Sequence, residues 1–368
     1  MMNKILALHE QTQKLWLRYE RHAMVLGFIA GFVADNLTLR RVDLWIENIF
    51  FAGYIIIAGM CVVLFNGYEN GGLHGRFGIR FYRFLPIIMQ FAFGALFSGF
   101  FVFYSRSASL GASWPFLLLL LTLLLSNEVL KKRYAKIVFQ LSIFFVTAFS
   151  YAIFIMPVII KRMNVYTFLL SGFAAILLVG LVSLGLRKVA RGSYLESRRN
   201  AILAIAAIYL IFNLLYFTNI IPPIPLSLKD IGVFHSVNRL ATGDYQVSYE
   251  PVKWYEFQKK SRPVFHRRAN EPIYVFSSVF APTKLNVPIL HRWSHYDETR
   301  KQWVEEGRIR FTISGGRDGG YRGYSVKTAL TPGLERAEVI TKRGQLIGRI
   351  TFIIEDAIYD PVLTDAIR

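Results

Sequence analysis

Hydrophobic residues occur in long runs over the first 225 positions of the chain and alternate with polar residues further on. A helix needs about 20 apolar residues to cross a bilayer, and seven runs approach that length. They lie at 24–39, 42–65, 84–104, 114–126, 137–160, 166–186 and 201–225. The seventh ends in Pro222, Pro223 and Pro225, which cannot continue a helix. The pattern therefore predicts an α-helical membrane bundle of about seven transmembrane helices over residues 23–225.

The segment before the first run predicts a helix of a different kind. Residues 1–22 interleave leucines with Lys14 and Arg18, which is typical of an amphipathic helix on a membrane surface. The first run, 24–39, is short and carries polar residues near its end. If it crosses completely, the number of spans is odd. A re-entrant half-span would make it even and would move the C-terminal domain to the other side of the membrane.

Beyond residue 272 the hydrophobic period changes from that of a helix to that of a strand. Residues with β-branched and aromatic side chains dominate six short runs, which lie at 273–282, 288–296, 308–316, 321–330, 334–341 and 345–355. Turn-forming residues separate these runs, and strands at such spacing indicate an antiparallel β-sandwich. We therefore expect an all-β, immunoglobulin-like sandwich domain at 273–356. A connector with one hairpin at 226–272 precedes it, and a C-terminal tail at 357–368 follows it.

Composition supports a membrane protein, and the charges predict its orientation. Hydrophobic residues make up 54% of the chain, which is more than an ordinary soluble protein carries. Lys and Arg outnumber Asp and Glu by 21 to 8 through residue 225. With a cytoplasmic N-terminus, 16 of these 21 basic residues fall in cytoplasmic segments, as the positive-inside rule requires. The net charge of +19 thus favours orientation in a membrane over binding of nucleic acid.

The cysteine and histidine content predicts no cofactor, metal or catalytic centre. Cys61 is the only cysteine, so neither a disulfide framework nor a cysteine metal site is expected. His291 and His295 share one predicted strand but lie about 13 Å apart there, which is too far for one metal ion. The N-terminus shows no cleavable signal peptide. A nucleophilic triad assembled from His235, His266, Asp244 and Ser236 has no supporting sequence frame.

Several segments of the C-terminal half resemble a known bacterial family. They are YVFSSVFAP, HRWSHY, TKRGQLIGRITF and above all GGRxxGYRxYS, matched by Gly315, Gly316, Arg317, Gly320, Tyr321, Arg322, Tyr324 and Ser325. The chain resembles proteins with the C-terminal domain of unknown function 2914, and its membrane half is similar to theirs as well. The resemblance implies an inner-membrane protein with this architecture and gives no activity. One departure is LERAEV at 334–339, where the family usually has a Trp-Arg pair.

The glycine-rich turn in this motif is the candidate binding site of the soluble domain. Arg317 and Arg322 supply planar forks suited to carboxylate or phosphate, and Tyr321 and Tyr324 can stack on a sugar or a peptide side chain. The alternative is a hairpin whose arginines pair with nearby acidic residues, namely Asp297, Glu298 or Asp318. A phosphate-binding loop is excluded because the strand, Gly-Lys and helix context is missing.

A second candidate site lies at the predicted outer ends of the first two spans. Its ionisable residues are Asp35, Arg40, Arg41, Asp43 and Glu47, together with Arg106 in the next outer loop. Ionisable groups at membrane depth are functional candidates, although these residues could instead form an ion-pair network that fixes the helical hairpin. The isolated amides Gln140 and Asn213 are expected to hydrogen-bond between helices.

Two functions from different classes follow. The preferred hypothesis is an inner-membrane protein that presents a periplasmic β-sandwich interaction module to an envelope protein or glycan. The alternative is a lipid-handling membrane enzyme or transporter with its polar pocket at the outer-leaflet ends of the first two spans. The lipid bilayer is the one partner that both share, and the oligomeric state is left open.

Overall fold

The computed structural model describes most of the chain beyond residue 44. The described residues are 33, 35, 45–73, 82, 84–107, 110–129, 136–223, 225–251, 263–268, 271–281, 287–313, 321–328 and 330–368. The chain divides into two compact units, Met1–Arg41 and Val42–Arg368. Within the first unit only Val33 and Asp35 are described, and both are helical. The predicted amphipathic helix at 1–22 and most of the first predicted span thus lie outside the described residues.

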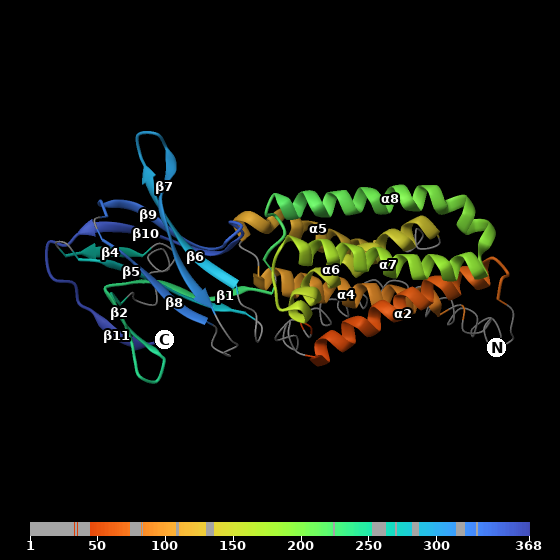
Figure 1. The fold of residues 1–368 in the computed structure, drawn as a ribbon, viewed down its shortest axis with the longest axis horizontal. Coiled ribbons are helices and arrows are strands. Elements are labelled where there is room, and N and C mark those ends of the chain that lie inside the picture. The colour runs from red at the N-terminus through yellow and green to blue at the C-terminus, as the bar shows by residue number, and fades with distance from the viewer. Residues whose placement is uncertain are drawn as a thin grey trace, which may run out of the picture. The chain divides into compact units, whose positions relative to one another are not determined.

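Six helices lie among the described residues in the first part of the second unit (Figure 1). They are α2 (Trp45–Glu69), α4 (Leu85–Ser107), α5 (Leu110–Val129), α6 (Ile137–Ile160), α7 (Val165–Val189) and α8 (Arg191–Phe217). All except α5 are long and apolar enough to cross a membrane, and the apolar part of α5 is the shorter segment Ser113–Leu124. The prediction of an apolar helical bundle is confirmed, with six helices in the described part of the chain instead of about seven.

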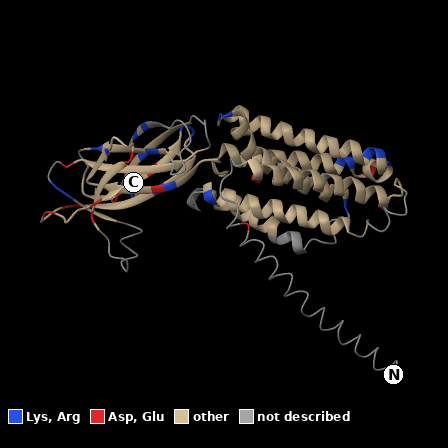
Figure 2. Cartoon of the chain, turned by 90° about the horizontal axis from the view of Figure 1, so that it is seen from below, with Lys and Arg blue, Asp and Glu red and all other residues tan. Residues whose placement is uncertain are grey.

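The charges follow the helix ends. Figure 2 shows Lys, Arg, Asp and Glu near the ends of the helices and few along their lengths. One predicted boundary differs from the structure, because the basic segment expected as a loop between the last two spans is helical. Only Ala190 separates α7 from α8, and its N–H bonds the carbonyl of Leu186 at 2.8 Å. Basic side chains exclude a segment from the hydrocarbon core, but Arg and Lys are good helix formers, so the helices continue past the predicted boundary.

The bundle core is aromatic and centred on α6. The Phe149 ring on α6 stacks on Phe212 of α8, with centroids 4.8 Å apart. Polar side chains inside the bundle form hydrogen bonds, as the apolar surroundings require. The amide of Asn66 on α2 donates to Gln140 Oε1 at 2.5 Å, so the expected interhelical bond of Gln140 is confirmed. Asn213 differs, because its amide donates to the Tyr209 carbonyl within α8.

Eleven strands in the described residues form three sheets after the bundle. The first sheet has the order β1 (Ser227–Phe234), β5 (Ile273–Phe280), β8 (Tyr321–Lys327). The second has the order β4 (Val264–Arg267), β10 (Leu346–Asp356), β9 (Gly333–Thr341), β6 (Val287–Asp297), β7 (Gln302–Ile313). The third has the order β11 (Thr364–Ile367), β3 (Tyr245–Tyr249), β2 (Ser236–Arg239). Neighbouring strands are antiparallel, apart from the parallel pair of β10 and β4.

A β-rich C-terminal region is therefore confirmed, while the immunoglobulin-like assignment stays a prediction. Each of the six predicted strands overlaps one of β5 to β10. The segment interpreted as a connector, 226–272, carries β1 to β4, and the segment interpreted as a tail, 357–368, carries β11. Three of these five strands hold only four residues each. Strands so short show too few alternations for the hydrophobic period to reveal them.

A buried polar network joins two of the sheets. His291 of β6 is fully buried, and its Nε2 and Nδ1 lie 2.8 Å from the hydroxyls of Ser277 on β5 and Ser325 on β8. The indole N–H of Trp293 also donates to Ser325 Oγ, at 3.0 Å. Burial lowers the pKa of His291 to about 3, so its imidazole is neutral. These residues belong to the segments that resemble the family, so much of that resemblance lies in core packing.

The network gives a test of the fold. Ser325→Ala should lower the local unfolding free energy of β5 and β6 by about 1–3 kcal/mol, because it leaves the buried indole N–H of Trp293 and the buried Nδ1 of His291 without their hydrogen-bond partner. Amide hydrogen exchange of the full chain in detergent measures this change. Ser236→Ala is the matched control, since its hydroxyl bonds only the half-buried Ser248. An equal loss in both variants would show that the network adds nothing.

Candidate functional site

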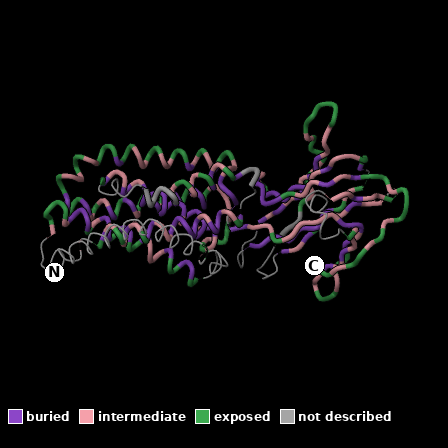
Figure 3. The backbone as a smooth tube through the Cα atoms, turned by 180° about the vertical axis from the view of Figure 1, so that it is seen from behind, coloured by how far each residue is buried: buried purple, intermediate pink, exposed green. Residues whose placement is uncertain are grey.

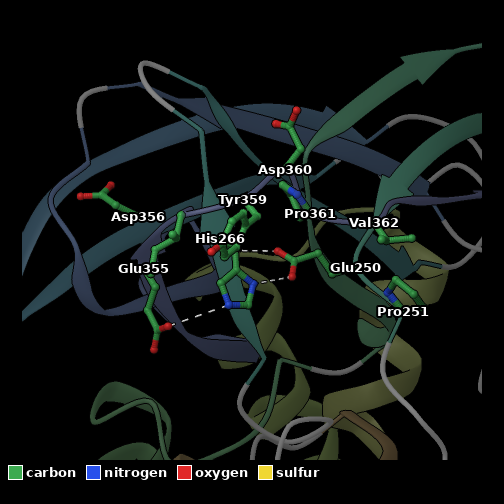
Figure 4. Close-up of a pocket in the computed structure, with 10 residues that line it drawn as sticks. Glu250, Pro251, His266, Glu355, Asp356, Tyr359, Asp360, Pro361 and Val362 are labelled. Carbon is green, nitrogen blue, oxygen red and sulfur yellow. Dashed lines mark hydrogen bonds and ion pairs between the residues drawn. The ribbon is translucent and has the colours of Figure 1, made fainter.

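A cleft of about 500 Å³ lies in the β-rich region where three segments meet (Figure 4). Glu250 and Pro251 follow β3, His266 lies on β4, and Glu355 and Asp356 end β10. The segment after β10 completes the lining with Ile358, Tyr359, Asp360, Pro361 and Val362. Strands β4 and β10 run parallel, with His266 opposite Glu355 in the register. The pairing of these two strands therefore places an imidazole and a carboxylate side by side at the cleft.

Glu250 is the polar centre of one wall. Its Oε2 lies 2.6 Å from Nδ1 of His266, and its Oε1 accepts the backbone N–H of His266 at 2.7 Å. The same Oε1 lies 3.1 Å from Nε2 of His235. Burial raises the pKa of Glu250, but the bonds from His235 and His266 outweigh it and hold the pKa at about 2. Glu250 is therefore a carboxylate at every physiological pH.

His235 lies beneath the cleft and carries the balancing charge. Its side chain is 2% exposed, and its Nδ1 lies 2.8 Å from Glu271 Oε1. The ring also stacks on Phe265, with centroids 4.1 Å apart. Burial lowers the pKa of His235, and the bonds to Glu250 and Glu271 reverse that effect and raise the pKa above its ordinary value. With a carboxylate at each ring nitrogen, the imidazolium form is favoured, because both nitrogens can then donate.

The rim of the cleft combines acidic side chains with exposed apolar ones. Nε2 of His266 lies 3.8 Å from Glu355 Oε2, which Figure 4 shows on the side of the ring opposite Glu250. Arg267 pairs with Asp356 at 2.6 Å and Arg268 with Asp360 at 2.8 Å. Three apolar side chains beside these acids are widely exposed, Ile358 at 87%, Tyr359 at 85% and Val362 at 78%. The cleft thus offers carboxylate acceptors next to uncovered apolar surface.

The described residues at the cleft do not bring together the serine, histidine and aspartate that a nucleophilic triad needs. The hydroxyl of Ser236 donates to Ser248 at 2.9 Å, and Asp244 pairs with Arg322 at 2.5 Å. His235 and His266 do meet, but through the shared carboxylate of Glu250. The nucleophilic triad considered from the sequence therefore does not form in the structure. Among the residues that the structure describes, no group of three His, Cys, Asp or Glu side chains is arranged to hold a metal ion.

The predicted binding residues of the glycine-rich turn have structural partners. Arg322 donates to Asp244 and to the carbonyl of Arg368, at 2.5 and 2.9 Å. Tyr321 is buried, and Tyr324 is partly exposed between the rings of Tyr245 and Tyr274. Arg317 lies outside the described residues. The sequence allowed for an ion pair between an arginine of the turn and Asp297, Glu298 or Asp318. Arg322 does form an ion pair, but its partner is Asp244, which is far away in sequence.

The segment 334–339, which departs from the family pattern, also has buried acidic side chains. Glu335 is fully buried and lies 2.7 Å from Nδ1 of His295, and burial raises its pKa to about 7. Glu338, also buried, accepts from Arg292 at 2.7 Å. The carboxylates of this stretch on β9 therefore serve the β6–β9 pair, as expected for a strand that does not form a binding surface.

The predicted polar pocket at the membrane surface stays a prediction. Glu47 is buried at the start of α2, and Arg106 is exposed near the end of α4. Asp35 is helical and belongs to the other compact unit. Arg40, Arg41 and Asp43 lie outside the described residues.

Sequence reasoning missed the cleft because its residues are far apart along the chain. Glu250, His266 and Glu355 belong to no shared motif, and two of them lie on or next to strands too short to predict. One signal was available in EDAIYDPVL at 355–363, which places isoleucine, tyrosine and valine among acids after a strand. Such residues outside a periodic pattern indicate exposed apolar surface.

Comparisons with known proteins identify a family for the C-terminal region. Residues 286–354 match the family described as Protein of unknown function (DUF2914), which confirms the resemblance for the C-terminal region. No curated protein matches the chain. Among solved structures, the chain is similar to a β-glucosidase from Listeria innocua in complex with gluconolactone, at 9% identity and a TM-score of 0.21. That match covers 35% of this chain and 16% of the glucosidase.

A second structural match is the alkylpurine DNA glycosylase AlkC from Pseudomonas fluorescens, bound to DNA containing an abasic site analog. It has 9% identity and a TM-score of 0.22, and it covers 77% of this chain and 83% of that chain. At these TM-scores neither likeness bears on the fold or on the function.

The paired charges beneath the cleft predict a pH optimum for its stability. Glu250 stabilises the fold above its ordinary pKa of 4.5 and loses that effect as pH falls toward 2. His235 stabilises it below its ordinary pKa of 6.5 and loses that effect as pH rises through its raised value. Local stability around β3 and β4 should therefore be greatest between pH 4.5 and 6.5. Hydrogen exchange, corrected for its intrinsic pH dependence, measures it.

Glu250→Gln should remove this optimum and lower the local stability by about 2–3 kcal/mol, because a bond to the buried charged ring of His235 is lost. Glu355→Gln is the control, since Glu355 is exposed and its contact with His266 is long, at 3.8 Å. A flat pH profile in the unaltered protein would contradict the charge assignment.

Proposed function

We propose that this chain is a multi-span inner-membrane protein whose β-rich domain, immunoglobulin-like in character, binds an envelope protein in the periplasm. The observation that carries the proposal is the cleft beside Glu250, with its carboxylates and three exposed apolar side chains. Exposed apolar groups in one cluster mark interaction surfaces in soluble domains. The cleft, and not the glycine-rich turn, is the binding surface in this proposal.

The chemistry of the cleft favours a peptide segment over a glycan. Ile358 and Val362 offer aliphatic surface that suits apolar side chains, while only Tyr359 offers an aromatic face for a sugar. Glu355 is exposed, and its one partner among the described residues is His266, at 3.8 Å, so it can accept a hydrogen bond from a lysine or arginine. The expected ligand is a segment of a protein partner with a basic residue next to apolar ones.

The acid–histidine chain preorganises the wall that the partner meets. Glu250 holds His266 through both its backbone and its ring, and His235 fixes Glu250 from below. A wall whose side chains are already fixed loses little conformational entropy on binding. The membrane helices would keep the module at the membrane, in the orientation that the loop charges predict.

Double substitution of the exposed apolar groups tests the proposal. In the full-length protein extracted from its own membrane in mild detergent, Tyr359→Ser/Val362→Ser should reduce the co-purified partner by roughly tenfold or more, because tyrosines are enriched among interface hot spots and the substitution of Val362 removes the apolar surface beside Tyr359. Val304→Ser/Val326→Ser is the matched control, since both valines are partly exposed elsewhere in the β-rich region.

The acidic arm of the proposal is tested separately. Glu355→Lys should weaken the same partner's retention through like-charge repulsion with its basic residue, whereas Arg322→Ala should leave retention unchanged. Equal retention by the Tyr359/Val362 variant and the unaltered protein would rule out the cleft. Loss of retention with Arg322→Ala alone would return the site to the glycine-rich turn.

A further inference from the structure

A second hollow, of about 690 Å³, lies between the last turns of α7 and the first turns of α8. We call it the α7–α8 groove. On α7 it is lined by Leu177, Leu181 and Leu184, spaced so that they share one face of the helix, and the same face continues to Arg187. Arg198 of α8 also lines the groove. The groove is therefore apolar along most of its length, and its two arginines lie at the end near the junction of α7 and α8.

The groove is open because α8 packs little of its length into the bundle. Of the residues of α8, only Ala201, Phe212 and Tyr216 are buried, and Figure 3 shows α8 as an almost continuous run of exposed and intermediate positions. Leu181 and Leu184 on the facing helix are 64% and 57% exposed. Both helices are long and apolar enough to cross a membrane, so this uncovered apolar surface is expected at hydrocarbon depth.

The length of the groove matches one leaflet of a bilayer. Leu177 and Arg187 are ten residues apart, which is about 15 Å along a helix. Half of a hydrocarbon core about 30 Å thick is the same distance. With the arginines at the headgroup level, the groove therefore reaches close to the middle of the membrane.

The arginines are available to a ligand. Arg187 and Arg198 are exposed, and neither forms an ion pair with a residue that the structure describes. Between residues 187 and 199 the sequence holds five basic residues and only one acid, Glu196, which does not line the groove. Two guanidinium groups at the end of an apolar groove are complementary to a phosphate joined to a hydrocarbon chain.

We propose that the α7–α8 groove binds an anionic phospholipid, with one acyl chain along Leu177, Leu181 and Leu184 and the phosphate between Arg187 and Arg198. A helix of a second copy would cover the leucines, but the cytoplasmic helix ends of that copy are basic in the same way, so it would bring like charges to the two arginines. A lipid satisfies both parts of the groove with one molecule. The positive-inside rule places this lipid in the cytoplasmic leaflet.

Lipid selectivity of the purified full chain tests this site. The probes are phosphatidylglycerol and phosphatidylcholine with the same acyl chains, and binding is measured by native mass spectrometry after release from nanodiscs that contain both. Each basic residue near an anionic lipid contributes a factor of about five, so phosphatidylglycerol should be preferred by roughly twenty- to thirtyfold. Arg187→Ala/Arg198→Ala should abolish the preference.

The matched control is Lys188→Ala/Arg199→Ala. It removes the same charge from the neighbouring positions of the same two helices, and neither residue lines the groove. It should keep most of the preference, whereas an equal loss in both double variants would mean general surface attraction and would overturn the proposal.

A filled groove gives an independent test. A side chain at Gly180, which also lines the groove, meets no atom within 4 Å at its Cβ position, and the same holds for Gly53 on α2. Gly180→Phe should therefore block retention of both lipids without disturbing the fold, and Gly53→Phe should not. Undiminished lipid binding by Gly180→Phe, or a stable dimer of the unaltered protein without bound lipid, would overturn the site.

Discussion

Backbone groups inside hydrocarbon must find hydrogen-bond partners within their own segment, and this constraint organises the whole chain. It makes the long apolar runs of the described residues helical, and it holds through Phe217, where α8 ends. Pro222 and Pro223 follow, and from Ser227 onward the backbone pairs between strands instead. Inside the bundle the same need is met by side chains, as the bond between Asn66 and Gln140 illustrates.

Within the β-rich region, polar side chains are buried only where they complete a network. His291 is satisfied by two serines from neighbouring strands, and its neutral ring carries no charge to be compensated. His235 shows the opposite solution, because two carboxylates hold it as a buried cation. The first network fixes the interior of the domain, whereas the second lies under its surface and shapes the cleft. The difference between them is the presence of a carboxylate, which decides the charge of the ring.

The two proposed sites share a physical character although they lie on different elements. In each, uncovered apolar side chains are placed beside charges, with acids near Ile358 and Val362 and arginines near Leu181 and Leu184. Opposite charges suit opposite ligands, a basic peptide in the first case and an anionic lipid in the second. Neither proposed site requires chemistry at a reacting atom.

The sequence by itself determined the two-part architecture. Runs of apolar residues reveal membrane helices, and alternation over seven or more residues reveals strands such as β6 and β8, because both periods repeat within the element itself. The family resemblance was also readable, since its segments are contiguous. The helical character of 187–199 was not, because basic residues can end a membrane run without ending a helix.

Only the tertiary structure decided which polar residues meet. The parallel pairing of β4 with β10 brings His266 to Glu355, and Glu250 joins them through its hydrogen bonds to His266. Arg322 pairs with Asp244 from 78 residues away. No local pattern encodes such pairings, because they depend on the register between strands that are distant in sequence. The same reason explains why the sequence suggested Asp297, Glu298 or Asp318 as partners of the motif's arginines, while Arg322 pairs with Asp244 in the fold.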